Sequence, residues 1–166
     1  AYGLGVMRAM PAIGAVAVSL VLSVRPIERN VGAKMLWAVA AFGLATIVFG
    51  LSRNFMLSLA ALTALGMADM VSVFIRITLM QLYTPDGMRG RVSAITGLAV
   101  SASNELGEMQ SGLAAALLGA TGAVVFGGVG AIVITALWAW IFPELRNART
   151  FASQYREPEP QREQVP

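Results

Sequence analysis

The chain has 166 residues and a net charge of +3, and 57% of its residues are hydrophobic while only 13% are charged. A soluble domain usually carries about 25% charged residues, so this composition argues against an ordinary soluble domain and favours a membrane protein. Without Cys or His, disulfides, thiolate chemistry and the usual zinc ligands are excluded. No catalytic set and no basic face with interleaved aromatic residues is visible. We therefore expect no enzyme activity, no cofactor or metal, and no nucleic-acid partner.

Five apolar segments follow one another along the chain. Crossing a bilayer core of about 30 Å takes roughly 20 apolar helical residues, and backbone polar groups in hydrocarbon must be satisfied within the segment. The sequence therefore predicts an all-α, polytopic transmembrane helix bundle over residues 1–145. After it, residues 146–166 are polar and Pro-rich, which predicts a cytoplasmic, largely disordered tail. The predicted helices are residues 4–24, 35–52, 55–83, 92–119 and 123–142.

Basic residues gather at one predicted side of this bundle. With five spans, the loop 25–34, the stretch QLYTPDGMRGRVSA at 81–94 and the early tail share that side, and only Arg53 lies on the other. Cytoplasmic loops carry an excess of Lys and Arg, so we expect an inner (plasma) membrane protein with a cytoplasmic C-terminus and the TPDG sequence as a cytoplasmic turn. The alternative for this stretch is a topology anchor and nothing more. The basic residues on that side are Arg25, Arg29, Lys34, Arg89, Arg91, Arg146 and Arg149.

The start of the chain suggests a piece of a longer protein. It opens AYGLGVMRAMP without Met, and an odd number of spans with the N-terminus outside is typical of an even-numbered bundle that lacks its first helices. The alternative is that Met was removed or the chain was trimmed.

Several of these stretches resemble the C-terminal half of a major facilitator superfamily transporter. They are TPDGMRGRVSA after a long apolar helix, SASNELGEMQSGLAAALLG in the next helix, and the opening LGVMRAMPAIGAV. Within that superfamily they look like the bacterial drug and siderophore exporters, including enterobactin exporters. The loop RPIERNVGAK keeps Arg25, Arg29, Gly32 and Lys34 of the family's cytoplasmic loop but lacks its aspartate, and the match in the second loop includes Arg89, Gly90 and Arg91. The resemblance implies family helices eight to twelve, seven further helices in the missing N-terminal half, and proton-coupled antiport.

Ionisable residues inside membrane helices are costly and are functional candidates by default. Asp69 and Arg76 stand seven residues apart in 55–83, so they point to nearly the same side, roughly 10 Å apart along the axis. We expect Asp69 to take part in proton coupling or substrate contact; the alternative is a structural ion pair, for example with Arg8. Arg76 lies nearer the cytoplasmic end, where its long side chain can snorkel.

A second set of polar residues shares one side of the segment 92–119. Glu105 and Glu108 lie one turn apart, and their carboxylates repel each other when both are charged. This repulsion favours binding of a proton or another cation. We expect this set to line a translocation cavity; the alternative is a hydrogen-bonded seam between helices. We name it the polar stripe, and its residues are Ser101, Asn104, Glu105, Glu108, Ser111 and Gly112.

Two further features lie in the first and last segments. Arg8, just before Pro11, is a candidate contact for an acidic substrate or carboxylate, or else an interface anchor. Small residues recur every fourth position in 123–142 and predict a close helix-packing face. These residues are Ala123, Gly127, Ala131, Thr135 and Ala139.

Together with these residues, the resemblance implies a secondary active transporter fragment that exports small amphipathic or siderophore-like molecules in exchange for protons. Its partners would be the lipid bilayer, the other half of the transporter, protons and a small-molecule substrate. The alternative is a small oligomeric membrane scaffold or assembly subunit without transport activity.

Overall fold

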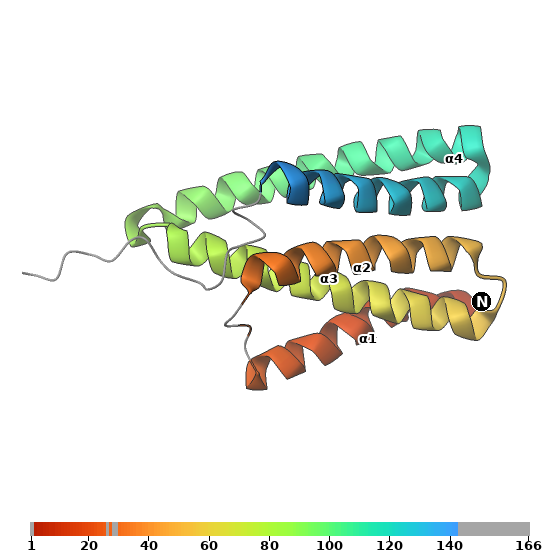
Figure 1. Cartoon of the computed structure of the whole chain (residues 1–166), viewed down its shortest axis with the longest axis horizontal. Helices are drawn as coiled ribbons and strands as arrows, with labels where there is room; N and C mark the ends of the chain where they lie inside the picture. Colours follow the sequence, from red (N-terminus) through yellow and green to blue (C-terminus); the bar gives the residue numbers. More distant parts are fainter. Residues whose placement is uncertain (1, 26, 28–29, 143–166) are drawn as a thin grey trace, which may run out of the picture.

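The computed structural model describes residues 2–25, 27 and 30–142, and apart from short turns these residues are helical, without strands (Figure 1). The helices are α1 (Tyr2–Val24), α2 (Val31–Leu51), α3 (Phe55–Tyr83) and α4 (Arg89–Ile141), with a short 3₁₀ turn η1 (Asp86–Met88) before α4. All four α-helices are long and apolar enough to cross a membrane. The predicted disordered tail and Arg29, Arg146 and Arg149 fall outside the described residues.

The fourth helix contains the two apolar segments predicted from the sequence, joined at a sharp kink. α4 runs for 53 residues, yet at Gly119 the backbone turns to φ 74° and ψ 168°, a region that is essentially restricted to glycine. Figure 1 shows α4 doubling back at its far end, so that it forms two arms side by side. We call residues 89–118 the first arm and residues 120–141 the second arm. The reversal that the sequence suggested between 119 and 123 is thus made by a single glycine, with no loop.

α3 packs against both α1 and α2, and α2 also packs against α4. The contact between α1 and α3 is close because two glycines face the neighbouring backbone. A Cβ atom on Gly66 would collide with the carbonyl group of Pro11, and one on Gly14 would collide with the carbonyl oxygen of Thr63. Small residues permit such close helix crossings, so the sequence fixes this crossing through Gly14 and Gly66.

A second glycine crossing joins α2 to the second arm of α4. A Cβ atom on Gly43 would lie 2.8 Å from the carbonyl oxygen of Gly128, and a Cβ atom on Gly128 would lie 2.7 Å from that of Gly43. Thr135 is buried on the same arm, where its hydroxyl donates to the Ala131 carbonyl at 2.6 Å. The predicted packing face is therefore right for Thr135 and wrong for Gly127, which meets open space. The physical reason is that α2 packs one residue further round the helix, over Gly128.

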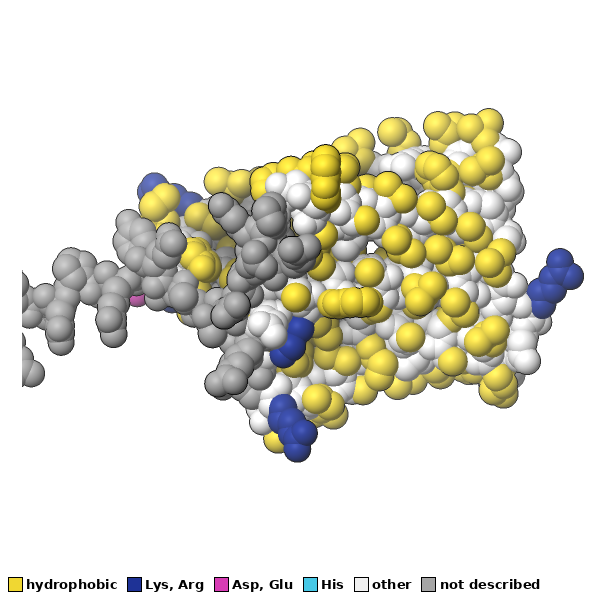
Figure 2. All heavy atoms as spheres, viewed as in Figure 1, with side chains coloured by type: hydrophobic (Ala, Val, Ile, Leu, Met, Phe, Trp, Pro, Cys, Tyr) yellow, Lys and Arg dark blue, Asp and Glu magenta, His cyan; other side chains and the backbone are white. Residues whose placement is uncertain are grey.

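The bundle has two distinct ends. One holds the end of α1, the start of α2, the α3–α4 junction and the end of the second arm, while the α2–α3 turn and the reversal of α4 lie at the other (Figure 1). Figure 2 shows hydrophobic side chains over most of the visible face, and the Lys and Arg side chains in view lie near the two ends. At the end with the α2–α3 turn, Asn54 caps α3 by accepting a hydrogen bond from the Met56 amide at 2.9 Å. An apolar middle with polar ends is compatible with a membrane protein.

Candidate functional site

The two ionisable residues of α3 lie away from its packing contacts. Asp69 and Arg76 are both exposed, whereas Ala68 and Ile75, the residues just before them, are buried. Neither side chain is therefore buried by the packing among the described helices. The cause is helical geometry: one residue turns the side chain by about 100°, which moves it from the packed side of α3 to an open one.

The polar stripe lies on the first arm of α4, and every residue in it is exposed. At about 100° per residue, its members fall within an arc of roughly 120°, as the sequence predicted. The first arm has no buried residue, and Cβ atoms added at Gly107 or Gly112 would meet open space. Within the described residues, then, nothing from α1, α2 or α3 covers the stripe.

The charged side chains of the helices do not pair with one another. In the part of the chain that the structure describes, the one salt bridge joins Arg89 to Asp86, so the ion pair considered for Asp69 and Arg8 is not formed. Arg8 is exposed on α1, three residues before Pro11, whose carbonyl lies at the crossing with α3. The structure therefore leaves Arg8, Asp69 and Arg76 as separate positions and does not gather them into one constellation.

Asp69 and Glu105 nevertheless lie at a similar depth along the bundle. Both α3 and the first arm of α4 meet at the same end, at Tyr83 and Arg89. At 1.5 Å per residue, Asp69 stands about 21 Å from that end and Glu105 about 24 Å. Two carboxylates are therefore placed well inside helices that are long enough to cross a membrane, although neighbouring packing does not bring them into contact.

The basic turn between α3 and α4 is held by its own side chains. Arg89 Nη1 lies 2.8 Å from Asp86 Oδ1, and Arg89 Nε donates to the Thr84 carbonyl at 3.4 Å. Thr84 in turn donates its hydroxyl to the Met80 carbonyl at 2.6 Å. Sequence reasoning missed the part played by Asp86, although its spacing of three residues from Arg89 was a usable signal.

The remaining basic-loop positions are surface residues. Arg25, Lys34, Gly90 and Arg91 are all exposed, and a Cβ atom on Gly90 would meet open space. A hollow of about 260 Å³ lies beside the turn, with Arg89 among the residues that line it. These features fit a polar turn at one end of the bundle.

Two open apolar grooves flank Trp37 on α2, and no pattern in the sequence indicates them. The larger, of about 690 Å³, lies between α1, α2 and α3, and the smaller, of about 370 Å³, lies between α2 and the second arm of α4. Among the described residues, no three His, Cys, Asp or Glu side chains lie close enough to hold a metal ion.

No protein-family model, no curated protein and no solved structure matches this chain.

Proposed function

We propose that this chain is part of a secondary active membrane transporter that exports small amphipathic or siderophore-like molecules in exchange for protons. One observation carries the proposal: Asp69, Glu105 and Glu108 are exposed, well inside helices that are long and apolar enough to cross a membrane. A charged side chain at the centre of a bilayer costs about 3 kcal/mol or more. These carboxylates must therefore meet water or further protein, and a translocation cavity supplies both.

The membrane placement rests on the distribution of charge. Arg25, Lys34, Arg89 and Arg91 lie at one end of the bundle and Arg53 at the other. The excess of basic residues on cytoplasmic loops supports a cytoplasmic location for the first end and for the C-terminus. The chain would then be a multi-pass protein of the inner (plasma) membrane.

The uncovered first arm of α4 supports a larger assembly. Its polar stripe has no partner among the described residues, which is expected if the helices of a second half-bundle pack there. The resemblance of residues 81–119 to the major facilitator superfamily favours a twelve-helix transporter, in which one half rocks against the other around a site near the midplane. Asp69, Arg76 and the stripe would line that site, and Arg8 would lie towards its outer end.

Transport by the full native polypeptide in inverted membrane vesicles tests the proposal, with ethidium as the amphipathic probe and an imposed pH gradient as the driving force. We expect Asp69→Asn, or Glu105→Gln together with Glu108→Gln, to abolish gradient-driven uptake or to change its pH profile. Asp86→Asn is the matched control, since it removes a carboxylate from the exposed turn. An unchanged rate and pH profile in both helix variants would overturn the proton-coupling role.

The second candidate is an oligomeric scaffold, and the same bare stripe favours it, because copies of the chain would cover each other's first arms. Substituted cysteines separate the two candidates, since residues 1–166 contain no cysteine of their own. Water-soluble thiol reagents should modify cysteines at 101, 105, 108 and 112 in a transporter. Uniform protection, together with crosslinks between copies, would instead support the scaffold.

A further inference from the structure

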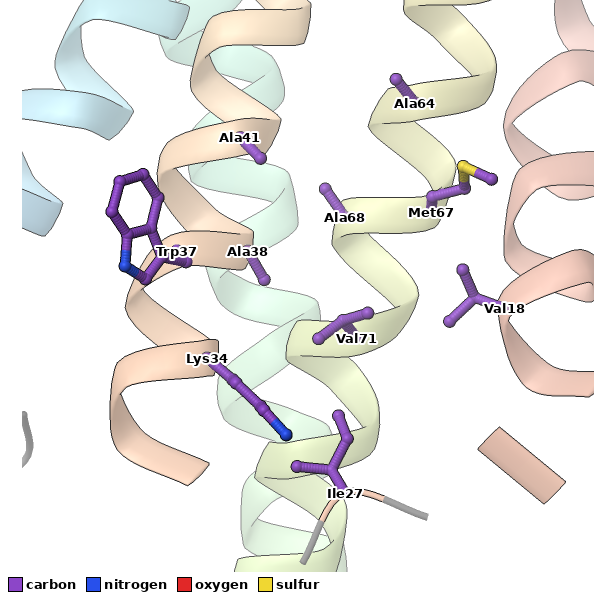
Figure 3. Close-up of a pocket in the computed structure, with 10 residues that line it drawn as sticks. All are labelled: Val18, Ile27, Lys34, Trp37, Ala38, Ala41, Ala64, Met67, Ala68 and Val71. Carbon is purple, nitrogen blue, oxygen red and sulfur yellow. The ribbon is translucent and has the colours of Figure 1, made fainter. Parts of the chain in front are cut away.

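The larger groove has the shape and lining of a site for an apolar chain. It lies on a side of α3 different from the one that carries Asp69 and Arg76, and its floor is made by small side chains. Figure 3 shows Ala38 and Ala41 of α2 pointing towards Ala64 and Ala68 of α3, with Val18 of α1 on the far side. α1 and α2 both pack on α3, and the alanines leave the space between them open. The hollow of about 690 Å³ is thus built into the helix arrangement.

A cation stands at one end of this groove. Lys34 lies in the first turn of α2, and Figure 3 shows its side chain reaching across the groove end towards Ile27. Ala41 is seven residues further on, which puts the apolar part about 10 Å deeper along the helix. The groove therefore has one charged end at the basic end of the bundle and an apolar interior.

Trp37 separates this groove from the second one. It is 76% exposed and lines both hollows, one on each side of α2. Trp is enriched where one end of a side chain is apolar and the other is wet, at the level of lipid headgroups. The two apolar grooves lie on either side of Trp37, and the ammonium group of Lys34 stands at the end of the larger one. This arrangement matches a molecule that has two apolar chains and one anionic head.

We propose that this surface binds an anionic diacyl phospholipid of the cytoplasmic leaflet, with its phosphate at Lys34 and its two acyl chains in the grooves on either side of Trp37. The inference rests on the membrane placement proposed above and is independent of transport. Lipid is favoured over another helix as the occupant because the cation sits at the headgroup end, where it complements a phosphate. The alanine floors suit a narrow acyl chain.

The test uses the full native polypeptide with Trp138→Phe and Trp140→Phe, in vesicles whose lipids have brominated acyl chains. Trp37 is then the one tryptophan left in residues 1–166, and its fluorescence quenching is read against the signal of any upstream Trp. We expect brominated phosphatidylglycerol to quench Trp37 with an affinity about fivefold higher than brominated phosphatidylcholine, as one Lys near the surface gives. Lys34→Gln should remove this preference. Ala41→Phe should weaken it by filling the larger groove, whereas Ala99→Phe, the same change at an exposed site on α4, should leave it intact.

Each other outcome overturns the inference. Equal quenching by both lipids, or an unchanged preference in Lys34→Gln and Ala41→Phe, would show ordinary bulk-lipid contact. If Trp37 escapes quenching while Trp138 or Trp140, each restored in turn, is quenched, another protein segment covers the groove. If none of the three is quenched, the membrane placement itself fails, which is distinct from a failure of transport.

Discussion

The glycines of the α1–α3 and α2–α4 crossings and those of the first arm of α4 look alike in the sequence but meet opposite surroundings. Gly14, Gly66, Gly43 and Gly128 face neighbouring backbone so closely that a Cβ atom would collide or press on it. Gly97, Gly107 and Gly112, which share the first arm with the polar stripe, meet open space. The first group lies at the contacts that hold the described helices together, and the second lies outside those contacts.

This difference teaches what a small residue in an apolar helix does and does not indicate. Two helices cross closely only where small residues let one backbone approach the other. Such a crossing contributes packing contacts and buries helix surface. A small residue beside Asn104 and Glu105 instead leaves room next to polar groups that need a partner or water. The two uses can be separated by substitution.

The largest expected effect is at the α1–α3 crossing. Gly66→Val would force side-chain atoms against the carbonyl of Pro11, and overpacking of this kind costs about 3 kcal/mol. We expect a loss of that order in the free energy of unfolding of the full chain, measured by denaturant titration in detergent. Gly107→Val is the matched control on the open arm, and an equal loss there would contradict the contrast between the two regions.

The next effect in size is at the α4 reversal. Gly119 has a backbone conformation that L side chains rarely adopt (φ 74°, ψ 168°), and forcing another residue into it costs about 2 kcal/mol. Gly119→Ala should destabilise the pairing of the two arms by that amount in the same titration. Gly127→Ala, a helical and open position, should have little effect or a slight stabilising one. If both variants behave alike, the strain at Gly119 is not what sets the reversal.

The smallest effect is expected at the basic turn. The Arg89–Asp86 pair is solvent-accessible, with side-chain exposures of 55% and 81%, and exposed pairs contribute about 0.5 kcal/mol or less. Asp86→Asn should therefore change the unfolding free energy by no more than that, and the change should shrink further at high salt. A loss comparable with that of Gly66→Val would mean that the turn organises the bundle, contrary to its exposed position.

Helix positions were largely predictable from the sequence because long apolar runs between polar turns leave few alternatives. The third segment, 55–83, coincides with α3, and the first ends at Val24 as α1 does. The charge of Lys34 predicts a loop up to residue 34 and a helix from 35, yet α2 begins at Val31. A long Lys side chain extends past its own turn, so a charge there does not end a helix.

Which residues share a side was also predictable, since 100° per residue fixes it once the helix is known. The side on which a neighbour packs was not: the sequence favoured Gly127, and α2 packs over Gly128. Nor could the sequence show that Asp69 and Glu105 stay apart, because that depends on how α3 and α4 are held by α2. The grooves beside Trp37 arise in the same way, from three helices at once.

The single-residue reversal at Gly119 has a consequence for biogenesis. Between Glu108 and the residues after Phe142 the chain carries no charge, and its turn is no more than Gly-Ala-Thr-Gly-Ala. If the two arms enter a bilayer, no hydrophilic loop has to be carried across, so both can leave the insertion machinery together as one preformed hairpin. The end of the hairpin on the far side of the membrane would then be set by Gly119 and not by a translocated domain.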